Sequence, residues 1–315
     1  MLGEPVGVAE LTRPRRLHPG DRVAVVAPSG PVRPDRLDAG CAILRSWGLQ
    51  VLIGAHVTGR HPRFGYLAGT DADRAADLQA AWLDPSVAAV LCARGGYGAQ
   101  RVLDLLDWPA LSQAGPKVFA GYSDVTAVHE AFATRLGLAT LHSPMAAAHA
   151  FVSDRQTAEG FRRTLFEPET VQALCLPGAL ALVPGQATGV TVGGCLSVLV
   201  AGLGVPGTRR CVGGGILVLE DVGEEPYRID RMLTQLMRSC WLDGVAGIAF
   251  GSLRDCGPDG LLRELVLDRL GPLGVPVVWN LGFGHGPSSL TVPLGVAATL
   301  DADQATLTLH HPALL

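Results

Sequence analysis

The chain is 315 residues long, a length that suggests two domains. Hydrophobic residues make up 48% of it and charged residues only 17%, a composition that predicts packed cores and argues against disorder. The formal net charge of −4 predicts no strongly basic face, so nucleic acid is not an expected partner.

The beginning of the sequence has the features of neither a signal peptide nor a membrane span. Residues 1–17 contain no continuous apolar run, and a Pro-Arg-Arg sequence at 14–16 interrupts them. No uncharged stretch of helical character reaches the ~18 residues that cross a membrane. The seven cysteines are scattered without a Cys-x-x-Cys pair, which is usual in a reducing compartment. We therefore expect a cytoplasmic protein that does not bind membranes.

Apolar β-branched runs alternate with helical patterns in the first half of the chain. Strands that alternate with helices predict a parallel sheet with helices on both faces. The expected strands span residues 22–27, 49–53, 87–92 and 118–120, and the expected helices span residues 35–47, 71–83, 99–106 and 125–135.

The composition changes between residues 151 and 185, where prolines and charged residues break the apolar runs. We interpret residues 161–185 as a linker between a domain at 1–160 and a second domain at 186–315. The second domain resumes the strand and helix patterns in looser form. Its expected strands are 216–219, 245–250 and 275–279, its expected helix is 226–238, and short strands are expected within 290–310.

Residues 121–124, with the sequence Gly-Tyr-Ser-Asp, place Ser123 between an expected strand and an expected helix. A serine on a sharp strand-to-helix turn has its hydroxyl held at the carboxyl end of a sheet. Backbone N–H groups at the start of the helix, with the helix dipole behind them, can stabilise a negative oxygen beside it. Ser123 is therefore a candidate nucleophile for a reaction that passes through an oxyanion.

A serine nucleophile needs a base, and the base needs an acid that orients it. Among nine histidines, His285 is the best candidate, because glycines flank it in a loop that directly follows the strand expected at 275–279. His129 lies six residues after Ser123 on the same expected helix but on another face, so we interpret it as a structural histidine.

Two adjacent carboxylates, Glu220 and Asp221, follow the strand expected at 216–219. Glu220 continues the alternation of that apolar strand and is expected to point inward. A buried carboxylate is costly without a partner, and a histidine N–H is a suitable one. Asp221 competes for the same role, and spacing alone does not separate the two.

The glycine-rich sequence Arg-Gly-Gly-Tyr-Gly at residues 94–98 lacks the spacing of a phosphate-binding motif. Its glycines can bring a backbone N–H close to a reacting carbonyl, and a plain tight turn is the alternative. Lys117, the only lysine, begins the strand that Ser123 ends, roughly 20 Å away, which argues against a Ser–Lys dyad. No His-Glu-x-x-His motif or cysteine cluster occurs, so we expect no metal and no cofactor.

Four motifs occur together in a fixed order, and in this order they resemble the LD-carboxypeptidases, which are serine peptidases with a Ser-Glu-His triad. The resemblance runs from about Val23 to Thr291. It implies a flavodoxin-like N-terminal domain and a smaller β-rich α/β C-terminal domain, with the active site between them. The motifs are residues 94–98, residues 121–124, Leu-Glu-Asp-Val at 219–222 with Pro-Tyr-Arg-Ile-Asp-Arg at 226–231, and Gly-His at 284–285.

The resemblance implies that Ser123 is the nucleophile, His285 the general base and Glu220 the residue that orients it. It also implies an oxyanion hole made by the backbone N–H groups of Gly96 and Asp124. The implied substrate is the murein tetrapeptide, which the family cleaves between the L-centre of a diamino acid and the terminal D-alanine during cell-wall recycling. A homodimer is common in the family.

One position departs from the family pattern. The family usually has asparagine after a Gly-Gly pair, whereas this chain has Cys195 there. That asparagine is expected near the substrate, so Cys195 bears on substrate preference. Arginines are expected to hold the substrate carboxylates, because bidentate pairing suits a guanidinium, and the candidates are Arg94, Arg228 and Arg231.

Two alternative functions stay open. A sister branch resembling microcin C immunity proteins cleaves aminoacyl-nucleotide toxins and carries a tryptophan in the connecting region. This chain has no tryptophan between Trp108 and Trp241, which disfavours that branch. A noncatalytic flavodoxin-like binding protein is the other alternative.

Overall fold

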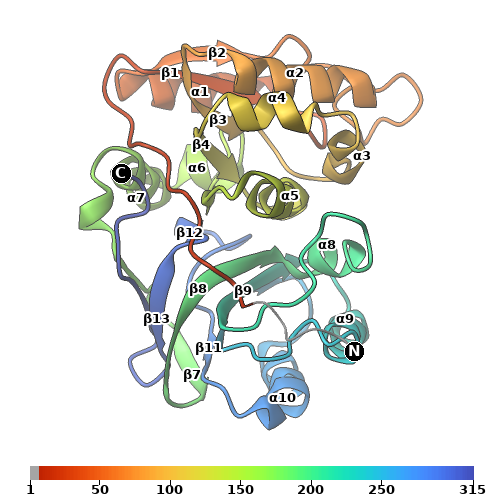
Figure 1. Cartoon of the computed structure of the whole chain (residues 1–315), viewed down its shortest axis with the longest axis vertical. Helices are drawn as coiled ribbons and strands as arrows, with labels where there is room; N and C mark the ends of the chain where they lie inside the picture. The colour runs from red at the N-terminus through yellow and green to blue at the C-terminus, as the bar shows by residue number, and fades with distance from the viewer. Residues whose placement is uncertain (1–6) are drawn as a thin grey trace.

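The computed structural model describes residues 7–315, in which two α/β domains are stacked on each other (Figure 1). The upper domain in that view is built on a six-stranded sheet, and the lower domain on an eight-stranded sheet. We call these the first sheet and the second sheet. This arrangement confirms the expected fold class.

The first sheet has the strand order of a flavodoxin-like domain. Five parallel strands run in the order β2-β1-β3-β4-β5, and β12 pairs antiparallel with β5 at the end of the sheet. The parallel strands are strongly apolar because helices cover both faces. They are β1 (Arg22–Val26), β2 (Gln50–Ile53), β3 (Val87–Cys92), β4 (Val118–Gly121) and β5 (Thr140–His142), with β12 at Val292–Leu294.

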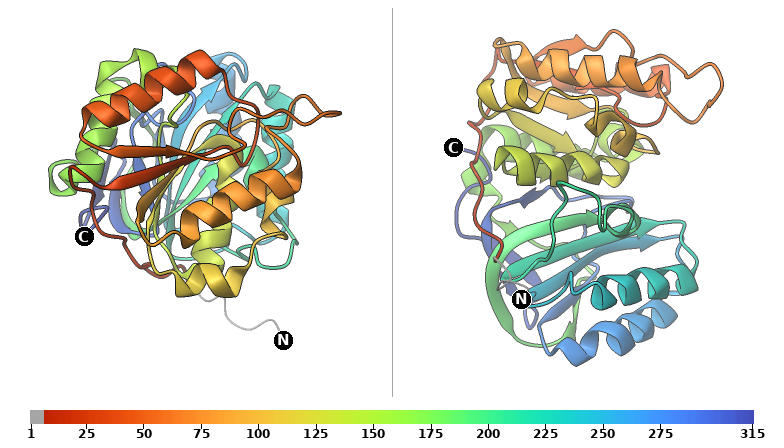
Figure 2. Two further views of the ribbon diagram at one scale, coloured as in Figure 1. Left: turned by 90° about the horizontal axis from the view of Figure 1, so that it is seen from above. Right: turned by 45° about the vertical axis from the view of Figure 1, so that its right-hand side comes forward.

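Helices pack on both faces of the first sheet, with α1 and α2 on opposite sides of it (Figure 2, left). The start of α2 is fixed by a capping box in which Thr70 and Asp73 bond reciprocally. The helices of this domain are α1 (Pro34–Ser46), α2 (Asp71–Leu83), α3 (Ala99–Leu103), α4 (Trp108–Gln113), α5 (Thr126–Leu136), α6 (His149–Ser153) and α7 (Arg155–Phe166), and the short 3₁₀ turn η1 spans Ser123–Val125.

The second sheet has a parallel centre, β8-β9-β10-β11, flanked by antiparallel strands in the order β6-β14-β13 on one side and β7 on the other. Helices α9 and α10 cover its outer face (Figure 1). The strands are β6 (Ala173–Leu174), β7 (Leu180–Val183), β8 (Gln186–Cys195), β9 (Gly215–Val222), β10 (Gly247–Arg254), β11 (Val277–Trp279), β13 (Ala297–Asp301) and β14 (Thr306–Leu309), and the helices are α8 (Leu196–Ala201), α9 (Pro226–Arg238) and α10 (Asp259–Leu270).

The stretch expected to be a linker, residues 161–185, contains more regular structure than a connection requires. It includes the second half of α7, the 3₁₀ turn η2 (Pro168–Thr170) and the edge strands β6 and β7. Helix α7 has many polar residues, and the edge strands β6 and β7 are short. None of the three contains the long apolar run that predicts the other elements. Regular structure there was therefore not visible in the composition.

Strand β12 links the two domains, because it comes from the last part of the chain yet belongs to the first sheet. Val292 pairs with His142 and Leu294 with Thr140 of β5. The next strand along the chain, β13, returns to the second sheet and pairs with β8. The division at 1–160 and 186–315 stays a prediction, and β12 crosses it.

Alternate residues of β9 enter different cores. Leu217 and Leu219 pack with the side chains of the outer helices. Ile216 and Val218 face the inside of the curved sheet, together with Phe283 and others. Glu220 follows Ile216 and Val218 in this period-two pattern, so its carboxylate is directed to the inner side, as expected.

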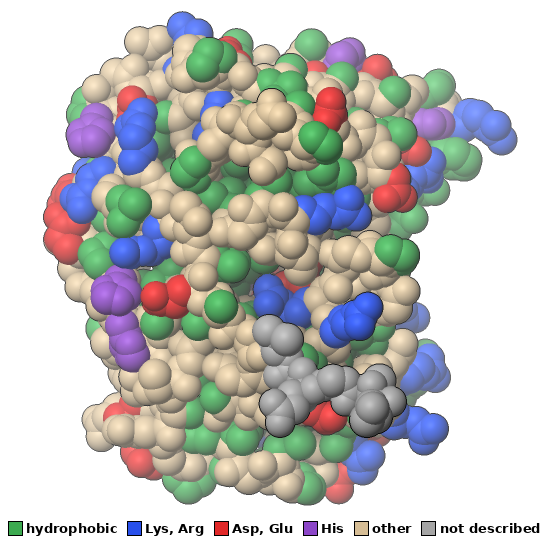
Figure 3. Space-filling model, viewed as in Figure 1, with side chains coloured by type: hydrophobic (Ala, Val, Ile, Leu, Met, Phe, Trp, Pro, Cys, Tyr) green, Lys and Arg blue, Asp and Glu red, His purple; other side chains and the backbone are tan. Residues whose placement is uncertain are grey.

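On the face shown in Figure 3, positive and negative side chains are interspersed, and neither sign covers a large continuous area. None of the helices within residues 7–315 is both long and apolar enough to cross a membrane.

A close backbone contact ties the second sheet to the start of α5. The N–H of Cys195 donates to Oγ1 of Thr126 over 3.0 Å. Gly194 makes this approach possible, because a Cβ at this position would lie 2.5 Å from the same hydroxyl oxygen, and its φ of +142° also favours glycine.

We expect Gly194→Ala to separate the two domains locally. Gly204 provides a matched control, because its φ of +80° is also positive but a Cβ there would meet nothing within 4 Å. Gly204→Ala should lower the free energy of unfolding by about 1 kcal/mol, the cost of a left-handed alanine. Gly194→Ala should lower it by about 2 kcal/mol more, the cost of overpacking, as measured by urea denaturation. Equal losses in the two variants would contradict the proposed contact.

Candidate active site

Ser123 lies at the carboxyl end of β4, at the first residue of η1 and three residues before α5. Its φ is +67°, a left-handed conformation that is rare for residues other than glycine. Such strain concentrates at functional sites, where the surrounding structure maintains it. The expected strand-to-helix turn is thus present, and it holds Ser123 in a constrained backbone geometry.

The loop at residues 94–98 packs directly against this turn. A Cβ at Gly95 would lie 2.8 Å from Cβ and 3.0 Å from Oγ of Ser123, so only glycine permits the contact. The loop is held from two sides: the N–H of Ala99 donates to Oδ2 of Asp124 over 2.7 Å, and buried Arg74 donates to the carbonyl oxygen of Gly98 over 2.8 Å. Ser123 and the glycine loop therefore form one structural unit.

Glu220 and His285 form a close buried pair. Nδ1 of His285 donates to Oε2 of Glu220 over 2.6 Å, and the carboxylate has no exposed surface. Gly284 makes room for this contact, because a Cβ at this position would lie 2.6 Å from the same carboxylate oxygen. Since Nδ1 is engaged, Nε2 is the ring nitrogen left to act on another group.

The pair shifts the ionisation of both partners. Burial alone would raise the pKa of Glu220, but the charge and hydrogen bond of His285, together with the nearby His142 ring, outweigh it and lower that pKa to about 2. Burial alone would lower the pKa of His285, and the carboxylate of Glu220 outweighs it, so the pKa of His285 is raised. The pair can therefore hold a proton on the imidazole while the carboxylate stays charged.

Asp221, which the sequence left as a competitor, serves a different element. Its Oδ2 accepts the N–H of Ser197 over 2.7 Å, and its Oδ1 accepts the N–H of Val222 over 2.8 Å. The first of these bonds satisfies a free donor at the start of α8. The structure thus brings Glu220, and not Asp221, to the His285 ring.

Tyr122 connects the serine turn to the Glu220–His285 pair. Its ring lies against that of His285, with a centroid separation of 4.7 Å, and Ser123 is the next residue along the chain. No hydrogen bond joins Oγ of Ser123 to the His285 ring in residues 7–315. Such catalytic bonds are often long without substrate and tighten when it binds.

A cavity of about 230 Å³ opens beside His285, lined by Tyr122, Arg254 and the loop at residues 285–287, among others. Arg254 ends β10 and donates to the carbonyl oxygen of His285 over 3.2 Å. Our sequence analysis did not select Arg254. Its position at the carboxyl end of a parallel strand, next to β9, which contains Glu220, is the signal that could have found it.

Both domains of the chain match those of one known protein family. Residues 23–143 match the model of the LD-carboxypeptidase N-terminal domain, and residues 188–300 match that of the LD-carboxypeptidase C-terminal domain. The chain belongs to the LD-carboxypeptidase family. The resemblance stated from the sequence is thereby confirmed, as is the expectation of a serine carboxypeptidase, and a noncatalytic binding protein is set aside.

Relatives of this LD-carboxypeptidase match along nearly their whole length. A putative carboxypeptidase of Streptomyces coelicolor is 63% identical over 97% of this chain and 98% of the relative. The murein tetrapeptide carboxypeptidase of Pseudomonas aeruginosa is 33% identical over 90% of this chain and 94% of the relative.

Two solved structures show the same fold. An MccF-like protein of Bacillus anthracis superposes with a TM-score of 0.84 at 25% identity and covers 94% of this chain and 98% of its own. The muramoyltetrapeptide carboxypeptidase of Oxalobacter formigenes superposes with a TM-score of 0.76 at 29% identity and covers 91% of this chain and 97% of its own. Both branches weighed in the sequence analysis are therefore represented among the structural neighbours of this LD-carboxypeptidase.

The residues expected to bind substrate lie in different surroundings. Arg94 is exposed beside Gly95 and donates to the carbonyl oxygen of Pro31 over 2.6 Å. Arg228 pairs with Glu224, and Arg231 lies over the ring of Tyr227 at 5.2 Å. Both of these arginines are exposed on α9.

Cys195 is buried next to the acid of the pair. It is the register partner of Glu220 on the neighbouring strand, and its Sγ lies 3.4 Å from Oγ of Ser197. Burial, together with the charges of Glu220 and Asp221, raises the pKa of the Cys195 thiol, which therefore stays protonated. The position that departs from the family pattern thus lies next to Glu220 on the neighbouring strand.

The residues rejected as catalytic partners have other roles. Both ring nitrogens of His129 are bonded, one to Oγ1 of Thr140 and one to the carbonyl oxygen of Gly121, each over 2.8 Å. Burial lowers the pKa of His129 to about 3, so it stays neutral, which confirms a structural histidine. Lys117 bonds the carbonyl oxygen of Asp84 at the opposite end of β4. No group of three or more metal-binding side chains gathers within the described part of the chain.

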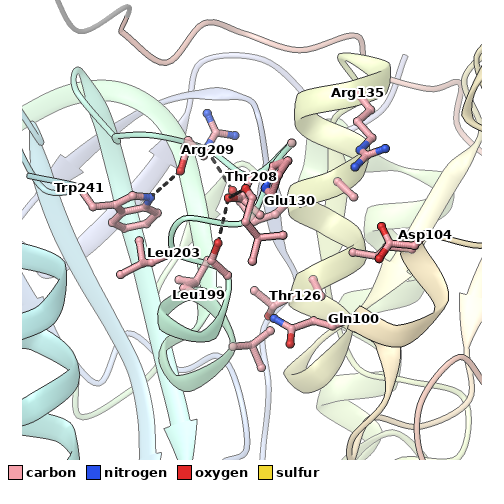
Figure 4. Close-up of a pocket in the computed structure, with 18 residues that line it drawn as sticks. Gln100, Asp104, Thr126, Glu130, Arg135, Leu199, Leu203, Thr208, Arg209 and Trp241 are labelled. Carbon is pink, nitrogen blue, oxygen red and sulfur yellow. Dashed lines mark hydrogen bonds and ion pairs between the residues drawn. The ribbon is translucent and has the colours of Figure 1, made fainter. Parts of the chain in front are cut away.

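A second, largely apolar cavity of about 130 Å³ lies between α5 and α8, where the two domains meet (Figure 4). Figure 4 shows Glu130 and Thr126 on α5 and Leu199 on α8 around it. Burial raises the pKa of Glu130 even though Arg209 lies 3.4 Å away. Since Ser123, Glu220 and His285 do not line this cavity, it is separate from the candidate active site.

We expect Glu220→Gln to lower the pKa of His285. The substitution removes the charge that raises this pKa, while the opposing effect of burial remains, so the value should fall below the ~6.5 of an ordinary histidine. NMR titration of the His285 ring measures it. Asp221→Asn is the matched control and should produce a smaller fall, because that carboxylate has the weaker effect on His285. An unchanged pKa in Glu220→Gln would contradict the 2.6 Å contact.

Proposed function

We propose that this enzyme releases the terminal D-alanine of murein tetrapeptide with Ser123 as nucleophile, His285 as general base and Glu220 as the acid that orients it. The observation that carries the proposal is the bonded Glu220–His285 pair, whose imidazole packs against Tyr122, the residue before Ser123. The relatives named for murein peptides support the substrate class. Cell-wall recycling is the context in which we expect this activity.

The reaction begins when Oγ of Ser123 attacks the carbonyl carbon of the bond before D-alanine. Nε2 of His285 takes the hydroxyl proton, and the negative charge that develops on the carbonyl oxygen is held by the N–H groups of Gly96 and Asp124. His285 then gives this proton to the nitrogen of the leaving D-alanine, and the C–N bond breaks. Water then attacks the acyl carbon while His285 takes one of its protons, the bond from that carbon to Oγ of Ser123 breaks, and His285 gives the proton to Oγ.

The left-handed backbone at Ser123 and the glycine contact at Gly95 support this assignment. Together they hold the hydroxyl beside the loop that contains Gly96, whose φ of +111° also requires glycine. We infer that substrate binding brings Oγ of Ser123 within hydrogen-bond distance of Nε2 of His285.

Arg254 is our candidate for the residue that holds the free carboxylate of the terminal D-alanine. It lines the cavity beside His285, and its guanidinium is about half exposed, with a side-chain exposure of 53%. A guanidinium is suited to bidentate carboxylate binding. Arg94, Arg228, Arg231 and Cys195 stay predicted substrate-binding residues, as the homodimer and the cytoplasmic location stay predictions.

The second candidate function is hydrolysis of aminoacyl-nucleotide compounds. It is favoured by the structural likeness to the MccF-like protein. It is disfavoured because this chain has no tryptophan between Trp108 and Trp241. A tryptophan is the residue replaced, by phenylalanine, in a variant of the microcin C7 self-immunity protein that was solved in complex with adenosine monophosphate. Incubation with a murein tetrapeptide and with an aminoacyl sulfamoyl adenosine, followed by mass spectrometry, distinguishes the two.

We expect Ser123→Ala to lower kcat on a tetrapeptide ending in D-alanine by about 10⁴-fold or more. The physical reason is the loss of the attacking oxygen with the rest of the site intact. Release of D-alanine, measured by mass spectrometry, gives the rate. A tetrapeptide ending in L-alanine is the substrate control and should not be cleaved. If Ser123→Ala retained more than a tenth of the wild-type rate, the proposed mechanism would be wrong.

We expect Arg254→Ala to reduce kcat/KM on the same peptide by about 10- to 100-fold, mostly through KM, because a charged hydrogen bond to the substrate carboxylate is lost. Arg254→Lys should retain part of the binding. Arg238→Ala, which removes an exposed arginine at the end of α9, is the control and should leave the kinetics unchanged. An unchanged KM in Arg254→Ala would exclude this role.

A further inference from the structure

A buried histidine that our sequence analysis did not single out lies on the other side of Glu220. We propose that His142 is a positioning residue that donates a hydrogen bond to the second carboxylate oxygen of Glu220 and so controls how the Glu220–His285 pair takes up protons. Nε2 of His142 lies 3.7 Å from Oε1 of Glu220, while Oε2 is bonded to His285. The inference rests on the proposed function, because it acts through the proposed acid.

The fold brings His142 to the pair through the first sheet. It is the last residue of β5, where Gly121 is its register partner on β4 and Val292 its partner on β12. Gly121 precedes the serine turn by two residues. His142 therefore occupies the same carboxyl edge of the sheet as Ser123, and Glu220 reaches that edge from the second sheet.

Unpartnered polar atoms identify the contact. Within residues 7–315, neither ring nitrogen of His142 has a hydrogen-bond partner, and Oε1 of Glu220 has none either. Both side chains are completely buried. Buried polar atoms without partners are rare and costly, and these atoms face each other at a distance that a shift of less than 1 Å turns into a hydrogen bond. Since a carboxylate only accepts, the proton must be on Nε2 of His142.

Neighbouring rings hold the imidazole in this orientation. Tyr122 meets it edge-to-face at 5.8 Å, and Phe283 does so at 5.5 Å. Tyr122 also lies against His285, so one aromatic ring packs on both histidines. A side chain that only filled space here would not need a nitrogen, and burying one without a partner would be unfavourable.

The titratable groups around the contact come from several elements. Facing His142 are Glu220 of β9, Tyr122 after β4 and, more distantly, His129 of α5. Facing Glu220 are the two histidines, the phenol of Tyr122 and the thiol of Cys195 on β8. Burial and the charge of Glu220 raise the pKa of the Tyr122 phenol. Burial and the charges of Glu220 and Asp221 raise that of the Cys195 thiol, so the phenol and the thiol both stay neutral. Facing His285 are Glu220, Asp221 and Arg254, and the pKa of His285 is raised, so His285 is the group of this cluster that exchanges its proton with the change in pH.

The direction of the pH effect follows from the geometry. A donor on Oε1 stabilises the carboxylate most when His285 is neutral, because an imidazolium already compensates the negative charge. Removing the donor therefore makes the pair take up its first proton more readily. As pH falls, a pair that takes up its proton at a higher pH stops acting as a base at that higher pH. The acid limb of kcat/KM, where activity falls with decreasing pH, should therefore move to higher pH.

The test compares His142→Leu, which removes the donor, with His142→Gln, which is of similar volume and keeps an N–H. In His142→Leu we expect the apparent pKa of the acid limb on a murein tetrapeptide to rise by at least about 0.5, with a fall in kcat of roughly 10-fold at neutral pH. His142→Gln should restore most of both. Thr191→Val removes a buried hydroxyl bonded to the carbonyl oxygen of Val296 and is the control that loses stability without moving the limb.

Two results would overturn the inference. One is an acid limb that stays in place in His142→Leu while activity falls equally in Leu and Gln variants, because this is what a purely structural role gives. The other, which needs no variant, is an NMR spectrum of the wild-type protein with the His142 ring proton on Nδ1 instead of Nε2. Full activity in Ser123→Ala would instead mean that the proposed function has failed.

Discussion

The bond between the buried carboxylate of Glu220 and the ring of His285 is the interaction on which the rest of the site depends. A charge with no exposed surface is stable only if the protein replaces the water that it has lost. His285 does so on one oxygen, and this requires a glycine at 284 so that the loop can approach. The same bond leaves Nε2 as the ring nitrogen free to act on another group, so in the proposed mechanism stability and reactivity share one contact.

The two domains meet where this interaction is made. The serine turn belongs to the first sheet and the carboxylate to the second, so their relative position depends on contacts between domains. Two such contacts lie close by: the pairing of β12 with β5, and the N–H of Cys195 on Thr126, which begins α5. The polar atoms of the site are therefore held by backbone geometry from both sides.

Much of this architecture could be predicted from the sequence. The helix at 71–83, the strand at 87–92 and the helix at 226–238 agree with α2, β3 and α9 at both ends, because their apolar patterns and end signals coincide. Spacing alone did not decide between Glu220 and Asp221, since two adjacent carboxylates differ only in which face of a strand they occupy, and Glu220 was chosen through the family resemblance. His142 and Arg254 were missed because their significance arises only when strands far apart in sequence lie next to each other.

The origin of β12 has a consequence for synthesis and folding. The strand that completes the first sheet is made of residues 292–294, and these leave the ribosome long after residues 140–142 of β5. Until then β5 is an open edge, with unpaired backbone groups beside the imidazole that ends it. A chain cut before residue 292 would thus contain Ser123 but neither a completed first sheet nor a buried Glu220 carboxylate, and we expect no hydrolysis from it.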